Sequence, residues 1–339
     1  MKITYVYNED WEKDYMTSRL PEHLFSFLKA PLEDSQSRLP APGVARQAGD
    51  ADTEILSIFV NSHVGAVEMD RFPNLKLIAA RSTGFDHIDV AEAHRRGIVV
   101  SNVPSYGENT VAEFAFALLL ALSRKIYDSY HRIAEKGSFS QDGLRGFDLK
   151  GKTFGVVGTG RIGRHAIKMA KGFDMNVVAY DPFPTPAVAG ELSFEYLSLD
   201  DLLSRSDIIS LHAPYNEHTH HLINMGNIGK IKRGAYLINT ARGGLVETTA
   251  LVKALEEGIV AGAGLDVLEE EGHMKDDIEL LTSPHPKEEE LKTLLANHYF
   301  IDHPRGIVTP HNAFITQEAI VLILNTTIEN IKAFAANTP

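Results

Sequence analysis

The chain of 339 residues contains no cysteine. This absence excludes disulfides, thiolate metal sites and a cysteine nucleophile. Long hydrophobic runs are missing too: the longest, residues 114–122, spans nine residues, whereas a membrane-spanning helix needs roughly 20. The N-terminal residues carry no long apolar segment, so we expect no signal peptide, no membrane partner and a cytoplasmic protein.

An excess of basic charge is also absent. The sequence has 33 Lys and Arg residues against 45 Asp and Glu residues, which gives a formal net charge of −12. Because non-specific binding to nucleic acids depends on basic patches, this balance argues against a nucleic-acid partner. The hydrophobic share of 44% and the charged share of 23% are typical of a globular protein, and the length predicts about two domains.

Strand-like segments rich in Val and Ile occur in two series, separated by helix-tolerant stretches. The first series comprises residues 3–7, 55–60, 75–80 and 98–103. The second series comprises residues 153–157, 176–180, 207–211, 235–239, 262–267 and 306–309. Apolar strands that alternate with helices predict an α/β fold with parallel sheets covered on both faces.

Two long helices flank the second series. Asn109 is a plausible N-cap for the first. That helix is apolar all round over residues 114–122, so we expect it to be buried on every side, either in one domain's core or also against a second subunit. The last helix covers residues 316–335, and residues 272–303 look like a polar excursion. One apolar stripe of the last helix carries Ile320, Leu324, Ile328 and Ile331.

A dinucleotide fingerprint lies near the middle of the chain, after residues 1–157. It reads Gly158-Thr159-Gly160-Arg161-Ile162-Gly163 and stands between a predicted strand and a helix. Its first glycine permits a tight turn, its second lets a pyrophosphate approach the backbone, and its third lets the helix pack closely on the sheet. The helix N-terminus then faces the phosphates. The alternative is a tight turn that binds nothing.

Asp181 follows the fingerprint at the end of the next predicted strand, eighteen residues after Gly163. There its carboxylate can accept hydrogen bonds from an adenosine ribose. Its charge would repel a 2′-phosphate, so the sequence favours NAD over NADP. The position of the loop indicates that a nucleotide-binding unit is inserted into another domain.

Three candidate chemical groups lie just beyond strand ends of the second series: Arg242, Glu271 and His311. Ligands bind outside the carboxyl ends of parallel strands, so these groups can converge. Arginine binds a carboxylate bidentately, histidine supplies a proton, and a carboxylate orients the histidine and favours its charged form. Together they suit the reduction of a 2-oxo acid. Singly, each could be an ordinary ion-paired, core or solvated residue.

Four histidines gather between His212 and His221. Imidazole suits zinc, but neither a carboxylate nor the spacing completes a clean site, so we predict no metal. His212, Ala213 and Pro214 end a strand beside the expected crevice, and we expect them to contact NAD.

Over essentially its whole length the chain resembles the NAD-dependent D-isomer-specific 2-hydroxyacid dehydrogenases. The motifs follow the family's order. They are residues 81–89, 158–163, 210–214, 239–243, 264–267 and 309–311.

The resemblance implies two flavodoxin/Rossmann-like, doubly wound parallel-sheet domains with the active site in the cleft between them. A cofactor domain of residues 105–304 would be inserted into a substrate domain of residues 1–104 and 305–339, and a homodimer would form through the cofactor domain. It also implies that Arg242, Glu271 and His311 are catalytic.

Further site residues follow from the same resemblance. The expected NAD contacts also include Arg161, Ile162, Thr219, Thr240, Ala241 and Asp266. The expected substrate contacts are the backbone of Ser82, Thr83 and Gly84, with Tyr106 and Phe314. Tyr106 and Phe314 are similar to the D-lactate dehydrogenase branch, so we predict a substrate like D-lactate or pyruvate.

Two alternatives stay open at this point. The substrate could be another 2-hydroxy acid, such as a branched or aromatic one, hydroxypyruvate or phosphoglycerate; phosphoglycerate would need a further cationic group, and none stands out. The chain could instead be an NAD-sensing binding protein like the C-terminal-binding-protein corepressors, with slow or no turnover.

Overall fold

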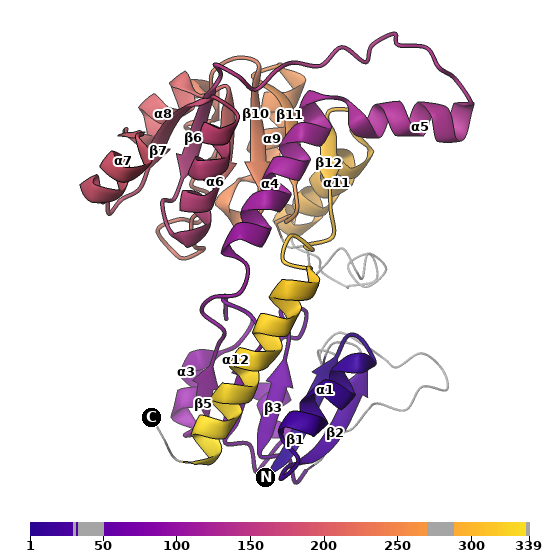
Figure 1. Cartoon of the computed structure of the whole chain (residues 1–339), viewed down its shortest axis with the longest axis vertical. Helices are drawn as coiled ribbons and strands as arrows, with labels where there is room; N and C mark the ends of the chain where they lie inside the picture. Colours follow the sequence, from indigo (N-terminus) through magenta and orange to yellow (C-terminus); the bar gives the residue numbers. More distant parts are fainter. Residues whose placement is uncertain (30–31, 33–50, 270–287, 337–339) are drawn as a thin grey trace. The chain divides into compact units, whose positions relative to one another are not determined.

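The computed structural model of the chain describes residues 1–29, 32, 51–269 and 288–336 (Figure 1). The chain divides into two compact units. Unit 1 comprises Met1–Tyr106 and Thr316–Pro339, and unit 2 comprises Gly107–Ile315.

Unit 1 is built on a five-stranded, all-parallel sheet in the order β2-β1-β3-β4-β5. Helices cover both faces, because one apolar cluster includes Met69 of α2 and Ala93 of α3, and another includes Met16 of α1 and Leu324 of α12. The strands are β1 Lys2–Tyr7, β2 Leu24–Lys29, β3 Ile55–Ile58, β4 Leu77–Ala80 and β5 Val99–Ser101. The helices are α1 Trp11–Arg19, α2 Ala66–Asp70, α3 Val90–Arg95 and α12 Gln317–Ala335.

The last helix packs as its stripe predicted. Leu324, Ile328 and Ile331 are buried in one cluster with Ile3 and Tyr5 of β1. The first strand of the chain and its last helix therefore share one core. β2 was not predicted: it is an edge strand with half-exposed residues, and Leu24 is 72% exposed.

Unit 2 is built on a seven-stranded, all-parallel sheet in the order β12-β11-β10-β9-β6-β7-β8. From β6 the chain first runs one way to β7 and β8, then returns and runs the other way from β9 to β12. The strands are β6 Thr153–Val157, β7 Asn176–Tyr180, β8 Glu195–Tyr196, β9 Ile208–Leu211, β10 Ala235–Asn239, β11 Val260–Leu265 and β12 Gly306–Val308. Two parallel sheets confirm the predicted α/β class.

Helices cover both faces of the second sheet as well. One apolar cluster holds side chains of α4 and α6, and the other holds side chains of α8, α9 and α11. The helices are α4 Glu108–Ser123, α5 Ile126–Lys136, α6 Arg161–Gly172, α7 Pro186–Leu192, α8 Leu199–Arg205, α9 Thr248–Glu256 and α11 Glu288–Asp302. Short 3-10 turns cover Ile228–Lys230 and Gly243–Leu245.

The predicted N-cap of α4 is wrong, and burial of α4 on every side is not met within this chain alone; its burial against a second subunit stays a prediction. The helix begins at Glu108 with Gly107 at its N-cap, and the side chain of Asn109 donates to Glu113 instead. The apolar run is not buried on every side within this chain, because Ala117 is exposed. Only the face that packs on α6 and the sheet is covered.

The segment 272–303 is not a simple polar excursion. Its described part contains α11, whose Phe300 is fully buried in the core of unit 2. β12 pairs in parallel with β11, so unit 2 continues to Ile315 rather than ending at residue 304.

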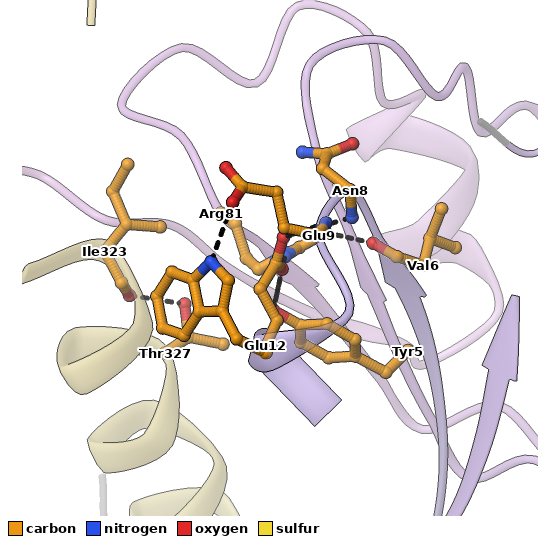
Figure 2. A network of polar contacts seen from close by, with 9 residues as sticks. Tyr5, Val6, Asn8, Glu9, Glu12, Arg81, Ile323 and Thr327 are labelled. Atoms are coloured by element: carbon orange, nitrogen blue, oxygen red, sulfur yellow. Dashed lines mark hydrogen bonds and ion pairs between the residues drawn. The ribbon is translucent and has the colours of Figure 1, made fainter. Parts of the chain in front are cut away.

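A buried ion pair joins distant parts of unit 1 (Figure 2). Arg81, directly after β4, is 2% exposed, and Glu12 of α1 is 3% exposed. Their Nη1 and Oε2 atoms lie 2.6 Å apart. Arg81 also donates to the hydroxyl of Tyr5 and the carbonyl of Val6. Burial raises the pKa of Tyr5, which stays protonated and donates to Glu12 Oε2 over 2.7 Å.

The other oxygen of Glu12 organises the loop after β1. Its Oε1 atom accepts hydrogen bonds from the backbone N–H groups of Asn8, at 3.1 Å, and Glu9, at 2.9 Å. The pair therefore ties the carboxyl ends of β1 and β4 to the start of α1.

We predict that Glu12→Ala destabilises unit 1 by about 3–5 kcal/mol, because it leaves the Arg81 guanidinium buried without its counter-charge. The chain's only tryptophan, Trp11, lies in α1, so urea unfolding followed by its fluorescence reports on unit 1. The double variant Glu12→Leu with Arg81→Met should lose much less stability, because no charge stays buried. Equal losses in the two variants would contradict this account.

Candidate functional site

The glycine loop joins β6 to α6 and requires glycine at two places. Gly158 has a φ of +97°, and a Cβ there would lie 2.7 Å from the carbonyl oxygen of His212. A Cβ on Gly163 would lie 2.0 Å from the carbonyl oxygen of Gly158. Around Gly160 no atom of the described residues lies within 4 Å of the Cβ position, apart from its chain neighbours. This loop has the shape that a pyrophosphate needs against the N-terminus of α6.

The loop lies at the point where the strand order of unit 2 reverses. β6 pairs with β7 on one side and β9 on the other, and His212, directly after β9, donates its N–H to Val157 over 2.8 Å. Open α/β sheets bind ligands at such a switch point. The structure thus brings the glycine loop and the segment from His212 to Pro214 together, and Thr219 closes that segment by donating to Pro214 over 2.7 Å.

Asp181 comes directly after β7 and contacts the glycine loop. Its Oδ2 atom accepts hydrogen bonds from the N–H and the hydroxyl of Thr159, both at 2.8 Å. Its Oδ1 atom accepts the N–H of Phe183 at 2.9 Å. Arg161 lies at the start of α6, with Nη1 3.7 Å from Glu108, and Ile162 packs on the core.

His212, directly after β9, is a half-buried histidine whose ring is neutral. Burial lowers its pKa to about 4. Its Nε2 atom lies 2.9 Å from the hydroxyl of Ser210, and its buried Nδ1 atom has no hydrogen-bond partner among the described residues.

The loop after β10 carries Thr240, Ala241 and Arg242. Asn239 shapes it: its amide donates to the carbonyl of Arg242 over 2.9 Å, and its carbonyl accepts the N–H of Ala241 at 3.0 Å. Arg242 is half-buried. The hydroxyl oxygen of Thr240 is buried and has no hydrogen-bond partner in the part of the chain that the structure describes.

Asp266, directly after β11, holds the loop that carries His311. Its carboxylate accepts hydrogen bonds from the Thr309 hydroxyl at 2.5 Å, the Asn312 N–H at 3.0 Å and the Ala313 N–H at 2.8 Å. Its backbone carbonyl accepts the N–H of His311 at 2.9 Å. Burial raises the pKa of Asp266, and these donors oppose the rise.

The backbone of His311 is strained. Its φ is +52°, a region that residues other than glycine rarely adopt. Its ring lies edge-on to Phe314, with centroids 6.3 Å apart. Because β10, β11 and β12 are neighbours in the sheet, the loops that carry Arg242, Asp266 and His311 follow adjacent strand ends.

Glu271 lies outside the described residues, so the structure does not place the third predicted catalytic group. Its neighbour Glu269 is described and is fully engaged. Its carboxylate contacts the His221 ring and accepts the N–H and hydroxyl of Thr248 at 3.1 and 2.8 Å. Its backbone carbonyl accepts the amide of Asn297 at 2.8 Å.

The predicted substrate loop belongs to unit 1. Ser82 is buried, Thr83 is exposed and Gly84 is half-buried. Val103 secures this loop by donating its N–H to the carbonyl of Ser82 over 3.0 Å and accepting the hydroxyl of Thr83 at 2.9 Å. Tyr106 is half-buried and ends the first segment of the same unit.

The histidine-rich segment has other partners than a metal. The rings of His220 and His221 stack with centroids 3.8 Å apart, and the hydroxyl of Tyr215 lies 3.0 Å from His220 Nδ1. Within the described ranges, no group of His, Asp or Glu side chains is arranged to hold a metal ion. No helix among those ranges is long and apolar enough to cross a membrane.

Several contributors escaped sequence reasoning. Asn239 could have been found, because an Asn that bonds to its own following backbone is a local turn pattern. Thr159 lies inside the glycine fingerprint, but the sequence alone did not predict its bonds to Asp181. Glu269 and Tyr196 carry no local signal, since their partners come from distant segments.

Comparison with known proteins gives concordant matches. A family model described as D-isomer specific 2-hydroxyacid dehydrogenase, NAD binding domain, matches residues 116–313. The chain is 36% identical to 2-hydroxyacid dehydrogenase A of Aspergillus oryzae, covering 98% of this chain and 92% of that relative. It is 42% identical to a glyoxylate reductase of Thermofilum pendens, covering 76% of this chain and 78% of that relative.

A solved structure extends these matches to the fold. The D-lactate dehydrogenase of Aquifex aeolicus, complexed with NAD and lactic acid, superposes with a TM-score of 0.81 at 33% identity. The match covers 99% of this chain and 96% of that chain.

Acid should weaken unit 2 through His212. Its ring takes up a proton near its ordinary pKa of 6.5 in the unfolded chain but only near 4 in the folded one. The folded state therefore loses stability as the pH falls from 6.5 towards 4, by up to about 3 kcal/mol. Urea unfolding followed by far-UV circular dichroism should show a steeper loss in the wild type than in His212→Gln. Identical pH slopes would contradict the assignment.

Proposed function

Because the chain belongs to the NAD-dependent D-isomer-specific 2-hydroxyacid dehydrogenases, we propose that it interconverts pyruvate, or a similarly small 2-oxo acid, with the D-2-hydroxy acid. The family reaction is the transfer of a hydride between NAD(H) and a D-2-hydroxy acid. The observation that carries the proposal is the strained loop of His311, which Asp266 holds in place. This loop and the loop of Arg242 both follow the carboxyl ends of strands in the sheet of unit 2.

NAD is the cofactor of the family, and unit 2 has the features that fit it. Bound there as NADH, it supplies the hydride. We propose that the loop from Gly158 to Gly163, including Arg161 and Ile162, holds the pyrophosphate and that Asp181 binds the adenosine ribose. The remaining proposed contacts are His212, Ala213, Pro214, Thr219, Thr240, Ala241 and Asp266. The buried hydroxyl of Thr240, which has no partner among the described residues, supports its inclusion, because such a group costs stability unless it gains a partner.

In the proposed reaction, Arg242 binds the substrate carboxylate through its two-pronged guanidinium. Protonated His311 donates its proton to the carbonyl oxygen as the carbonyl carbon is reduced, and neutral His311 accepts it in the reverse direction. Glu271 favours the charged imidazole and orients it. The fixed turn around His311 supports this role, since strain at a residue that is held by several bonds is common at active sites.

The substrate proposal assigns a separate role to each unit. We propose that unit 1 is the substrate domain and unit 2 the NAD domain. Backbone N–H groups of Ser82, Thr83 and Gly84 would help to bind the carboxylate, and Tyr106 and Phe314 would contact the substrate. Two of the matched proteins are named for short acids, a glyoxylate reductase and a D-lactate dehydrogenase, which supports a short side chain. Localisation in the cytoplasm stays a prediction from the sequence.

The reaction is tested by the loss of NADH absorbance with a panel of pyruvate, glyoxylate, hydroxypyruvate, 4-methyl-2-oxopentanoate and phenylpyruvate. We expect the highest kcat/KM with pyruvate, and His311→Ala should lower kcat about 100-fold to 10,000-fold without changing the Kd for NADH. His218→Ala is the matched control, because that side chain is 86% exposed. A branched or aromatic acid as best substrate would overturn the substrate assignment, and joint loss of turnover and NADH binding would overturn the role of His311.

We also propose a homodimer formed through unit 2. α5 projects beyond α4 at the side of this unit (Figure 1) and buries none of its residues. Its apolar side chains are exposed: Ile126 and Tyr127 by 57%, Tyr130 by 71% and Ile133 by 47%. Phe139, shortly after the helix, is 84% exposed. An apolar face of this kind on a globular protein is typical of a protein interface.

Charge placed on this face should dissociate the dimer. We expect Ile126→Glu with Tyr130→Glu to shift the mass measured by size-exclusion chromatography with light scattering from two chains to one. Leu24→Glu is the matched control, because Leu24 is at least as exposed as Ile126 and Tyr130 but belongs to the edge strand of unit 1. A double variant that stays dimeric would exclude α5 from the interface.

A further inference from the structure

The carboxylate of Asp181 is held by a chain of hydrogen bonds that begins at the N–H of Thr185, outside the glycine loop. Asp181 Oδ2 contacts Thr159, whose hydroxyl lies 2.9 Å from that of Tyr196. The Tyr196 hydroxyl in turn accepts the N–H of Thr185 at 3.2 Å. We propose that Thr159 and Tyr196 are positioning residues that set the preference for NAD over NADP by fixing the Asp181 carboxylate.

The direction of this relay follows from counting hydrogens. A hydroxyl carries one hydrogen, and Thr159 uses its own to donate to Asp181. Tyr196 must therefore donate to Thr159, while its oxygen accepts from the N–H of Thr185. All three bonds point towards the carboxylate. Hydrogen bonds in such a line polarise one another, and the last one ends on a charged acceptor.

The relay leaves the carboxylate little freedom. Thr159 donates twice to Oδ2 and Phe183 donates once to Oδ1, so a rotation of the carboxylate would break several charge-assisted bonds. A carboxylate offers about four acceptor sites, and these three donors leave one on Oδ1. A ribose hydroxyl would use that remaining site. The 2′-phosphate of NADP would be repelled by the negative charge of the Asp181 carboxylate, which its hydrogen bonds hold in one orientation.

Burial supports a positioning role for both residues. Thr159 is only 4% exposed, and Tyr196 is half-buried at the end of β8, whose pairing with β7 fixes its place beside Asp181. Both side chains act on NAD through Asp181. The inference rests on the proposed role of Asp181 at the ribose, and it does not depend on which 2-oxo acid is the substrate.

The test measures Kd for NADH and NADPH by the fluorescence of the bound nicotinamide, without any 2-oxo acid. We expect Tyr196→Phe to reduce the preference for NADH about 2-fold to 10-fold, the effect of one neutral hydrogen bond. Thr159→Val, which loses the bond to the charged carboxylate, should reduce it about 10-fold to 100-fold. Thr159→Ser, which keeps the hydroxyl, should retain the preference, and Tyr236→Phe, at the start of β10, is the matched control.

The decisive variant is the double one. If Tyr196 acts only through Thr159, adding Tyr196→Phe to Thr159→Val changes nothing further, and non-additivity of this kind is what a shared relay requires. Additive effects, or unchanged preference in both single variants, would overturn the relay. Asp181→Ala separates the two levels: if it alters the preference while the relay variants do not, only the relay fails; if it has no effect, the proposed role of Asp181 fails as well.

Discussion

Parallel pairing of β6 with both β7 and β9 is the constraint on which unit 2 depends. Because every strand of that sheet runs the same way, each carboxyl end delivers its following loop to one edge. The glycine loop, Asp181 and His212 follow β6, β7 and β9, while Arg242, Asp266 and His311 follow the next strands outward. The reversal of strand order at β6 opens the place where those loops can separate around a ligand.

The same kind of hydrogen bonding fixes the loops that follow these strands in both units. Asp266, Asp181 and Glu12 are acidic side chains that accept backbone N–H groups from a neighbouring loop. Such charge-assisted bonds are stronger than neutral ones and hold a turn in one conformation. In unit 2 this bonding stabilises the positive φ of His311. In unit 1 it fixes the turn after β1, and Arg81 supplies the counter-charge directly before the loop of Ser82 and Thr83. Both units therefore hold loops at the carboxyl ends of their strands by the same chemistry.

Local patterns were sufficient for much of the fold and for the cofactor. The apolar strands, the glycine fingerprint and Asp181 are readable because each depends on residue types within one short segment. The stripe on α12 is readable for the same reason, since its apolar residues recur at helical spacing. β2, β8 and α11 were missed. β2 is a half-exposed edge strand without a clear alternation, β8 has only two residues, and α11 lies in a segment whose charged residues conceal its buried Phe300. The roles of Arg242 and His311 stay predictions, and Glu271 lies outside the described residues.

The sequence by itself determined the family, the cofactor and most of the strands, because these follow from patterns whose parts are neighbours along the chain. Only the tertiary structure decided which side chains fix the loops at the strand ends. Thr309 contacts Asp266 across 43 residues, Tyr196 contacts Thr159 across 37, and Arg81 contacts Glu12 across 69. Hydrogen bonds of this range depend on how strands are ordered and loops return, and no periodicity within a segment encodes them.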